Sequence, residues 1–189
     1  MENKYKCKLG DIASFNFGYY GKATENDGVA YLQVRNFSEN GDFLYNVENY
    51  ISLSNVKKEM LLKQDDIIFV SKGMKFFAHK YDEDLGPSVA SSIFYVIKVN
   101  TVVVLPDYLT CILNHPKSLI YFNSVSAGSS IPSIRKKELL DFEINIPSIE
   151  IQKKIVEINN LHKKQIAILE QLKQNKQILF NQLINKLNK

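Results

Sequence analysis

The chain has 189 residues, 45% hydrophobic and 11% aromatic, enough for the core of one ordinary domain with an appendage, which argues against disorder. It shows no apolar signal region at its start and no stretch approaching the roughly 18 apolar residues of a membrane helix, so we expect a cytoplasmic protein. The net charge of +4 is uneven: residues 148–189 carry eight lysines and three glutamates, whereas residues 1–147 carry 16 basic and 17 acidic residues, so composition alone does not make the first part a nucleic-acid binder.

Residues 1–147 contain a mixture of strand and helix patterns. Enrichment in β-branched and aromatic residues predicts strands at the segments 29–37, 66–71, 75–81, 92–99 and 142–146. Short helices are expected at the segments 54–62, 106–114, 116–125 and 133–140. Strands gathered early and helices gathered late favour an α+β domain over a regular βαβ alternation.

The turn-forming residues stop at a clear boundary. All eight glycines lie at or before Gly128, and all five prolines lie at or before Pro147. Ser148 is a suitable N-cap, and the following segment from Ile149 to about Leu187 has no helix breaker, so one long helix is predicted there. The division is therefore a mixed globular domain at 1–147 and a helix at 148–189.

The long helix carries a row of apolar residues, which we call the apolar stripe. Its members recur at spacings that place them on one face, with His162, Gln165 and Lys176 on or beside the row. Such a stripe is best covered by another helix, so a coiled coil that dimerises the chain is predicted; the alternative is that the helix packs back on its own domain. The apolar stripe consists of Ile151, Ile155, Ile158, Leu169, Leu172, Leu179 and Leu183.

No enzyme motif is recognisable. The histidines His79, His115 and His162 lie outside nucleophile-elbow and metal-helix spacings, and the two cysteines lack the spacing of a zinc site or a disulfide framework. There is no glycine-rich phosphate loop and no Asn/Asp-Pro-Pro-aromatic tetrapeptide, which amino-methyltransferases use to hold a target base. We therefore expect no catalytic residue, no metal and no cofactor.

Several phrases, in order along nearly the whole chain, resemble the specificity (S) subunit of Type I restriction-modification systems. They are KLGDIA at 8–13, YLQVRNF at 31–37, LLKQDDIIF at 61–69, GSSIPSI at 128–134, LLDFEINIP at 139–147 and QKKI at 152–155. Asp65 stands where that family often has glycine, and aspartate tolerates tight turns better than most residues.

The resemblance implies a target-recognition domain that reads a short half-site of double-stranded DNA, followed by a spacer helix. It also implies partners that do the chemistry: methyltransferase (modification) subunits docked on the helix, and a restriction or translocase subunit. Such subunits normally carry two recognition domains and two antiparallel spacer helices. With one of each, this chain resembles a half-subunit or a truncated form, so a homodimer through antiparallel helices is expected.

DNA recognition requires cations for phosphates and forked side chains for base edges. Four groups of candidates fit, each with a structural alternative: a surface salt bridge, an ordinary hairpin, a domain lid and a solvated capped helix, respectively. The groups are Arg35 and Asn36 at a strand end; Lys72, Gly73 and Lys75 in a turn; Tyr19, Tyr20 and Lys22 in a loop; and Ser129, Ser130, Ser133, Arg135 and Lys136 at a helix start.

We therefore expect a DNA-recognition subunit without catalysis of its own. The rival is a coiled-coil interaction protein, an adaptor or an inhibitor, whose globular part binds protein. The nearly neutral charge of residues 1–147 keeps that rival open.

Overall fold

A four-stranded antiparallel sheet forms the centre of the computed structural model, which describes residues 5–23, 28–126 and 130–188. Its strand order is β2 (Ala13–Phe17), β8 (Phe94–Val99), β5 (Ile67–Val70) and β6 (Ala78–Lys80). All four residues of β5 are fully buried, which explains why that strand is a continuous apolar run rather than an alternating one.

Two smaller sheets complete the globular part, which we call the head. In one, β3 (Val29–Leu32) pairs antiparallel with β4 (Tyr50–Ile51) and parallel with β7 (Ser88–Ala90). In the other, β1 (Tyr5–Lys8) pairs antiparallel with β9 (Glu143–Ile146), so the two ends of the head lie side by side. A short helix, α1 (Leu9–Ile12), connects β1 to β2.

Three helices cover the core of the head. Both α2 (Pro106–Leu113) and α3 (Pro116–Val125) begin with a proline at the first helical position, where the missing N–H costs nothing. The third is α4 (Lys136–Leu140). Leu109, Leu113 and Phe122 are fully buried. The head therefore combines antiparallel sheet with helices that follow it in the chain, which confirms the α+β class.

Most of the predicted elements are present. The strands expected at 66–71, 75–81, 92–99 and 142–146 contain β5, β6, β8 and β9, and three of the four short helices are found. The strand expected at 29–37 ends at Leu32, and a 3-10 turn, η1 (Val34–Asn36), follows it. A further turn, η4 (Glu83–Leu85), precedes β7.

The helix predicted at 54–62 is wrong. Two 3-10 turns, η2 (Leu53–Asn55) and η3 (Lys58–Met60), occupy this segment. Val56 between them is extended, with φ −109° and ψ 121°, because its side chain is buried in a small cluster with β3, β4 and β7. Tertiary packing thus overrides the local helix pattern.

Asp65 adopts the left-handed backbone conformation, with φ +68°. The turn into β5 requires a positive φ at this position, a conformation that glycine adopts without steric cost. Aspartate is among the residues that tolerate this region.

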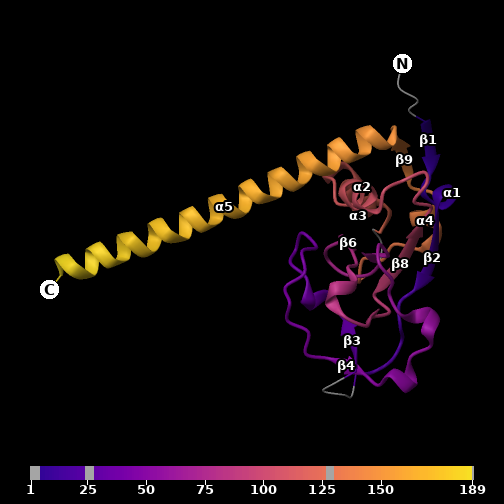
Figure 1. The fold of residues 1–189 in the computed structure, drawn as a ribbon, viewed down its shortest axis with the longest axis horizontal. Helices are drawn as coiled ribbons and strands as arrows, with labels where there is room; N and C mark the ends of the chain where they lie inside the picture. The colour runs from indigo at the N-terminus through magenta and orange to yellow at the C-terminus, as the bar shows by residue number, and fades with distance from the viewer. Residues whose placement is uncertain (1–4, 24–27, 127–129, 189) are drawn as a thin grey trace.

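The last helix, α5 (Ile149–Leu187), begins at the predicted N-cap, where Ser148 Oγ accepts a hydrogen bond from Ile151 N. Its first turns pack on α2 and the remainder leaves the head, as Figure 1 shows. Every residue from Asn160 to Asn188 is exposed. The helix thus packs back on the head only at its start. Within the described ranges, no helix is both long and apolar enough to cross a membrane.

Candidate nucleic-acid interface

Two of the predicted groups, far apart in the sequence, meet on one surface. Lys72 and Ser133 form an antiparallel β-bridge. Gly73 N donates a hydrogen bond to Pro132 O at 3.0 Å, and Ile134 N donates to Ser71 O at 2.9 Å. We call the exposed face of residues 72–74 and 130–136, with Phe17 beside it, the turn surface.

The central sheet holds the turn surface in place from behind. Tyr95 Oη, on β8, donates to Ile134 O at 3.0 Å, and Ser71 Oγ, at the end of β5, donates to Ile93 O at 2.6 Å. Gly73 has φ +132°, a conformation that favours glycine, so the turn that carries Lys72 depends on that residue type. The surface is therefore built on rigid elements rather than on a free loop.

Lys136 lies across the end of β2. Its Nζ donates to Phe15 O at 2.9 Å and lies 5.9 Å from the centroid of the Phe17 ring, a cation–π geometry. The Phe17 ring itself contacts Tyr95, with ring centroids 5.4 Å apart. The side chain of Lys136, which begins α4, is thus oriented by β2, while its remaining N–H groups stay available at the surface.

The other members of this group differ in accessibility. Arg135 is exposed, and its backbone N–H donates to Glu138 Oε2 at 2.6 Å, so a carboxylate of the same chain already occupies this donor at the start of α4. Ser130 is exposed and Ser133 is half-buried. Ser129 lies outside the described residues.

Only part of the Tyr19–Lys22 segment faces solvent. Tyr19 is half-buried: its ring meets Tyr31 edge-on at 6.1 Å, and its backbone N–H donates to Ala90 O at 2.7 Å. Tyr31 Oη in turn donates to Gly21 O at 3.2 Å. In contrast, Tyr20 is 91% exposed and Lys22 is exposed. Tyr19 therefore supports the segment, and Tyr20 and Lys22 are presented by it.

The side chain of Asn36 is buried and, contrary to the prediction, is not presented at the surface beside Arg35. It is 1% exposed; its side-chain oxygen accepts from Gln33 N at 2.7 Å, and its Nδ2 donates to Asn46 O at 3.0 Å. The amide therefore fixes the loop around η1 and has no free group to read a base, which corrects that assignment. Arg35 remains exposed on the same turn.

The remaining candidate cations differ in their partners. Lys75 forms an ion pair with Glu39. Among the described residues, neither Lys72 nor Arg35 takes part in an ion pair. An exposed cation without a carboxylate partner keeps its full charge for a phosphate or a base, which makes Lys72 and Arg35 strong candidates.

Sequence reasoning missed the apolar side chains on this surface. Phe17 is 62% exposed and Met74 is 82% exposed, next to Lys136 and Lys72 respectively. Apolar side chains near cations can contact the methyl group of thymine in the major groove. A search for cations and amides overlooks them, and the only local signal is an apolar residue within a Lys-Gly-Met-Lys turn.

A buried glutamine joins the head to α5. Gln152 is fully buried; its Oε1 accepts from Leu105 N at 2.8 Å, and its Nε2 donates to Val103 O and Pro147 O, both at 3.0 Å. Farther along, Lys163 pairs with Asp42 at 2.7 Å. These contacts fix the direction in which the helix leaves the head.

The contacts between the head and the start of α5, which we call the joint, divide the apolar stripe into two parts. Ile155 packs against the head core and Ile151 is half-buried, so Ile155 is not free to dimerise the chain as predicted. The other five members, from Ile158 onward, are all exposed. At about 100° per residue, Gln152 lies roughly 140° around the axis from the centre of these five, so they face away from the head.

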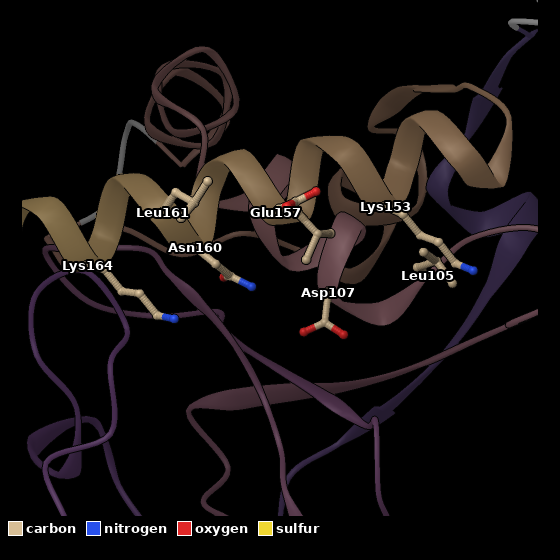
Figure 2. A pocket seen from close by; sticks show the side chains of 8 residues that line it. Leu105, Asp107, Lys153, Glu157, Asn160, Leu161 and Lys164 are labelled. Atoms are coloured by element: carbon tan, nitrogen blue, oxygen red, sulfur yellow. The ribbon is translucent and has the colours of Figure 1, made fainter.

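A groove runs between the start of α5 and the segment that leads into α2. Figure 2 shows Asp107 and Leu105 on one side and Lys153 and Lys164 on the helix. Asp107 is already paired with Lys80 at 3.0 Å. The described part of the chain contains no cluster of three His, Cys, Asp or Glu side chains that suits a metal ion.

Comparisons with known proteins agree on one family. The family model described as "Type I restriction modification DNA specificity domain" matches residues 1–179. The Type I restriction enzyme HindI specificity subunit of Haemophilus influenzae is 31% identical over 133 residues, which are 65% of this chain and 28% of that protein.

Two solved structures share the fold. The S subunit of a Type I restriction-modification system from M. genitalium matches with a TM-score of 0.63 at 12% identity, over 90% of this chain and 42% of that one. The HsdS subunit from Thermoanaerobacter tengcongensis matches with a TM-score of 0.63 at 15% identity, over 89% and 39%. The chain thus spans less than half the length of these relatives. With a family model that covers all but its last ten residues, the chain belongs to the Type I restriction-modification DNA specificity domain family.

Proposed function

We propose that the chain is the DNA-recognition subunit of a Type I restriction-modification complex, in which residues 1–147 read one half of a bipartite target and residues 148–189 space and assemble the complex. The observation that carries this proposal is the match of the family model to residues 1–179. The turn surface supplies the physical basis, because it places unpaired and oriented cations beside exposed apolar side chains on a rigid sheet.

We assign different tasks to the candidate residues on the turn surface and to three candidates outside it, Tyr20, Lys22 and Arg35. Lys72, Lys22 and Lys136 contact phosphates, which positions the head on the duplex without reading sequence. Arg35, with its forked guanidinium, reads a base edge, and Phe17 and Met74 contact thymine methyl groups. Tyr20 packs against the backbone or a groove wall. Other subunits perform methylation and cleavage, so the chain acts without catalysis of its own.

The helix assembles the complex in the same proposal. Five exposed members of the apolar stripe face away from the head, and each large apolar side chain gains about 1.5–3 kcal/mol on full burial. Two copies paired through antiparallel helices cover each other's stripe and place their heads at opposite ends. A helix of 39 residues spans about 58 Å, so the homodimer reads an interrupted palindrome. Methyltransferase subunits bind to the remaining helix surface.

Salt dependence tests this function against a protein-binding adaptor. We expect the affinity of the chain for its target duplex to fall steeply as salt rises from 50 to about 200 mM, through counterion release. Lys72→Ala should reduce the slope by about one for each bound chain, with Lys186→Ala at the far end of α5 as the matched control. Binding that is absent at low salt, or that is independent of salt, would contradict DNA recognition.

The oligomeric state tests the assembly separately. Light scattering at micromolar concentration should give the mass of a dimer. Polar substitution of both Ile158 and Leu172 should convert it to a monomer with an unchanged head, because both side chains are exposed and lie on the face of α5 that is turned away from the head. A monomeric parent chain would remove the homodimer from the proposal and leave half-site recognition standing.

A further inference from the structure

The exposed part of α5 has a heptad pattern that three polar residues interrupt. One set of positions, seven residues apart, contains Ile158, Gln165, Leu172 and Leu179; the other contains His162, Leu169, Lys176 and Leu183. These two sets form the seam of a two-stranded coiled coil. Gln165 and Lys176 are exposed in the single chain, and no ion pair involves Lys176 among the described residues. The seam therefore needs a partner that accommodates one imidazole, one amide and one cation.

The polar residues disfavour a parallel pair. In a parallel coiled coil in register, each seam position faces its own copy, so Lys176 would face Lys176 and His162 would face His162. Like charges directly opposite each other are destabilising, and the apolar environment of a seam strengthens their repulsion. In an antiparallel pair each set faces the other, so Lys176 faces a residue of the Ile158 set.

The possible antiparallel registers differ by whole heptads. In one of them, a polar seam residue of one copy lies opposite a polar seam residue of the other. When Leu169 faces Leu172, Gln165 faces Lys176 and Ile158 faces Leu183. Lys176 Nζ can then donate to Gln165 Oε1, twice per dimer by symmetry. Most of the remaining layers pair apolar residues, and only His162 against Leu179 is mixed.

The two neighbouring registers fit less well. A shift of one heptad toward the head places Lys176 against Ile158 and Gln165 against Leu169, and it requires Ile155, which is packed on the head core. A shift of one heptad the other way places Lys176 against Leu172 and leaves Ile158 uncovered. Each of these buries a polar group against an apolar one, which costs free energy without a compensating hydrogen bond.

We propose that two copies of this chain pair through α5 in an antiparallel coiled coil whose register places Gln165 of one copy opposite Lys176 of the other. The proposal rests on the homodimer proposed above and specifies its geometry. It sets the offset between the two Ser148 residues at 45 helical residues, or about 68 Å along the axis, against about 57 Å for the register shifted toward the head.

Charge substitutions at one position test the register. Gln165→Glu places a carboxylate opposite Lys176 twice per dimer, so the dimer dissociation constant should fall roughly tenfold. Gln165→Lys should raise it by a similar factor, and adding Lys176→Glu to that variant should restore it. The residues three and four positions from Gln165 are Leu161, His162, Ile168 and Leu169, so neither charge meets a lysine, an arginine or a carboxylate at these spacings within its own helix.

In the register shifted toward the head, residue 165 faces Leu169, and either charge weakens the dimer. Equal weakening by Gln165→Glu and Gln165→Lys in sedimentation equilibrium would therefore overturn the proposal.

Disulfide cross-linking gives a second measurement. In a background of Cys7→Ser and Cys111→Ser, a mixture of Gln165→Cys and Lys176→Cys chains should form a mixed cross-linked dimer on mild oxidation. Gln165→Cys alone should not cross-link, because each copy then faces Lys176. Cross-linking of Ile158→Cys with Lys176→Cys instead would refute this register while leaving the homodimer intact. Salt-dependent DNA binding, measured on the same chains, reports the proposed function independently.

Discussion

Replacing Gln152 by methionine should loosen the joint between head and helix. Methionine has nearly the same length and volume but no amide, so the change removes three hydrogen bonds, to Leu105 N, Val103 O and Pro147 O. Residue 152 is fully buried, so water does not readily replace the lost partner. Each bond contributes about 0.5–1.5 kcal/mol, and a buried group left unsatisfied costs about 1–3 kcal/mol. We expect a loss of about 2–5 kcal/mol of unfolding free energy.

Two measurements check this value. For a chain of this size, the loss corresponds to a decrease in Tm of roughly 5–15 °C. Hydrogen exchange should accelerate at the amide of Leu105, whose partner is removed, well before exchange in β5. Gln171→Met, on the exposed part of the same helix, is the control and should change stability by less than about 0.5 kcal/mol. A Gln152→Met chain with the stability of the parent and unchanged protection at Leu105 would show that the amide does not hold the joint.

Three further predictions concern recognition, catalysis and pH. Arg35→Ala should cost roughly 1–3 kcal/mol and relax one position of the methylated target, whereas Lys72→Ala should weaken all sequences alike; an unchanged methylation pattern in the Arg35 variant would contradict its role. The purified chain alone should incorporate no labelled methyl groups into DNA, and any incorporation without partners would refute a non-catalytic role. Burial lowers the pKa of His79, whose Nδ1 lies 2.9 Å from Gly41 O, so the unfolded chain binds more protons and stability should fall as pH drops from about 7 through 6.5 and below. His79→Gln should flatten that slope in urea titrations, whereas the raised pKa of buried Asp66 acts in the opposite sense.

The long-range and conformationally special features of the head were the hardest to predict. The helix α5 follows directly from a segment without glycine or proline, and α2 and α3 follow from their N-terminal prolines. The strand β1 escaped prediction because its four residues gain strand character only from β9, more than 130 residues later. The segment 54–62 reads locally as a helix, but burial of Val56 interrupts it.

The candidate interface was also only partly predictable, because it too depends on contacts between residues that are distant in the sequence. The residue types that attract DNA were visible in the sequence, but their accessibility depends on neighbours that the sequence does not place. In the sequence, Asn36 resembles an amide that could read a base. In the fold, its side chain accepts a hydrogen bond from Gln33 N and donates one to Asn46 O. The contact between Lys72 and Ser133 joins residues about 60 positions apart, so two separately predicted groups become one surface. Exposed Phe17 and Met74 carry no polar signature at all.

The pairing of β1 with β9 has a consequence for how such a head can be exchanged. Tyr5 lies opposite Ile146, so the chain enters and leaves the head about one strand spacing apart, roughly 5 Å, at the root of α5. A segment with adjacent ends can be spliced into a new context without displacing what flanks it. The hydrogen bonds of the Gln152 side chain go only to main-chain atoms, which any incoming head can supply, whereas Ile155 and Val156 require an apolar surface on that head. Recombination at these two points can therefore replace the DNA-reading surface as a unit. The length of α5, and with it the proposed spacing between half-sites, is retained.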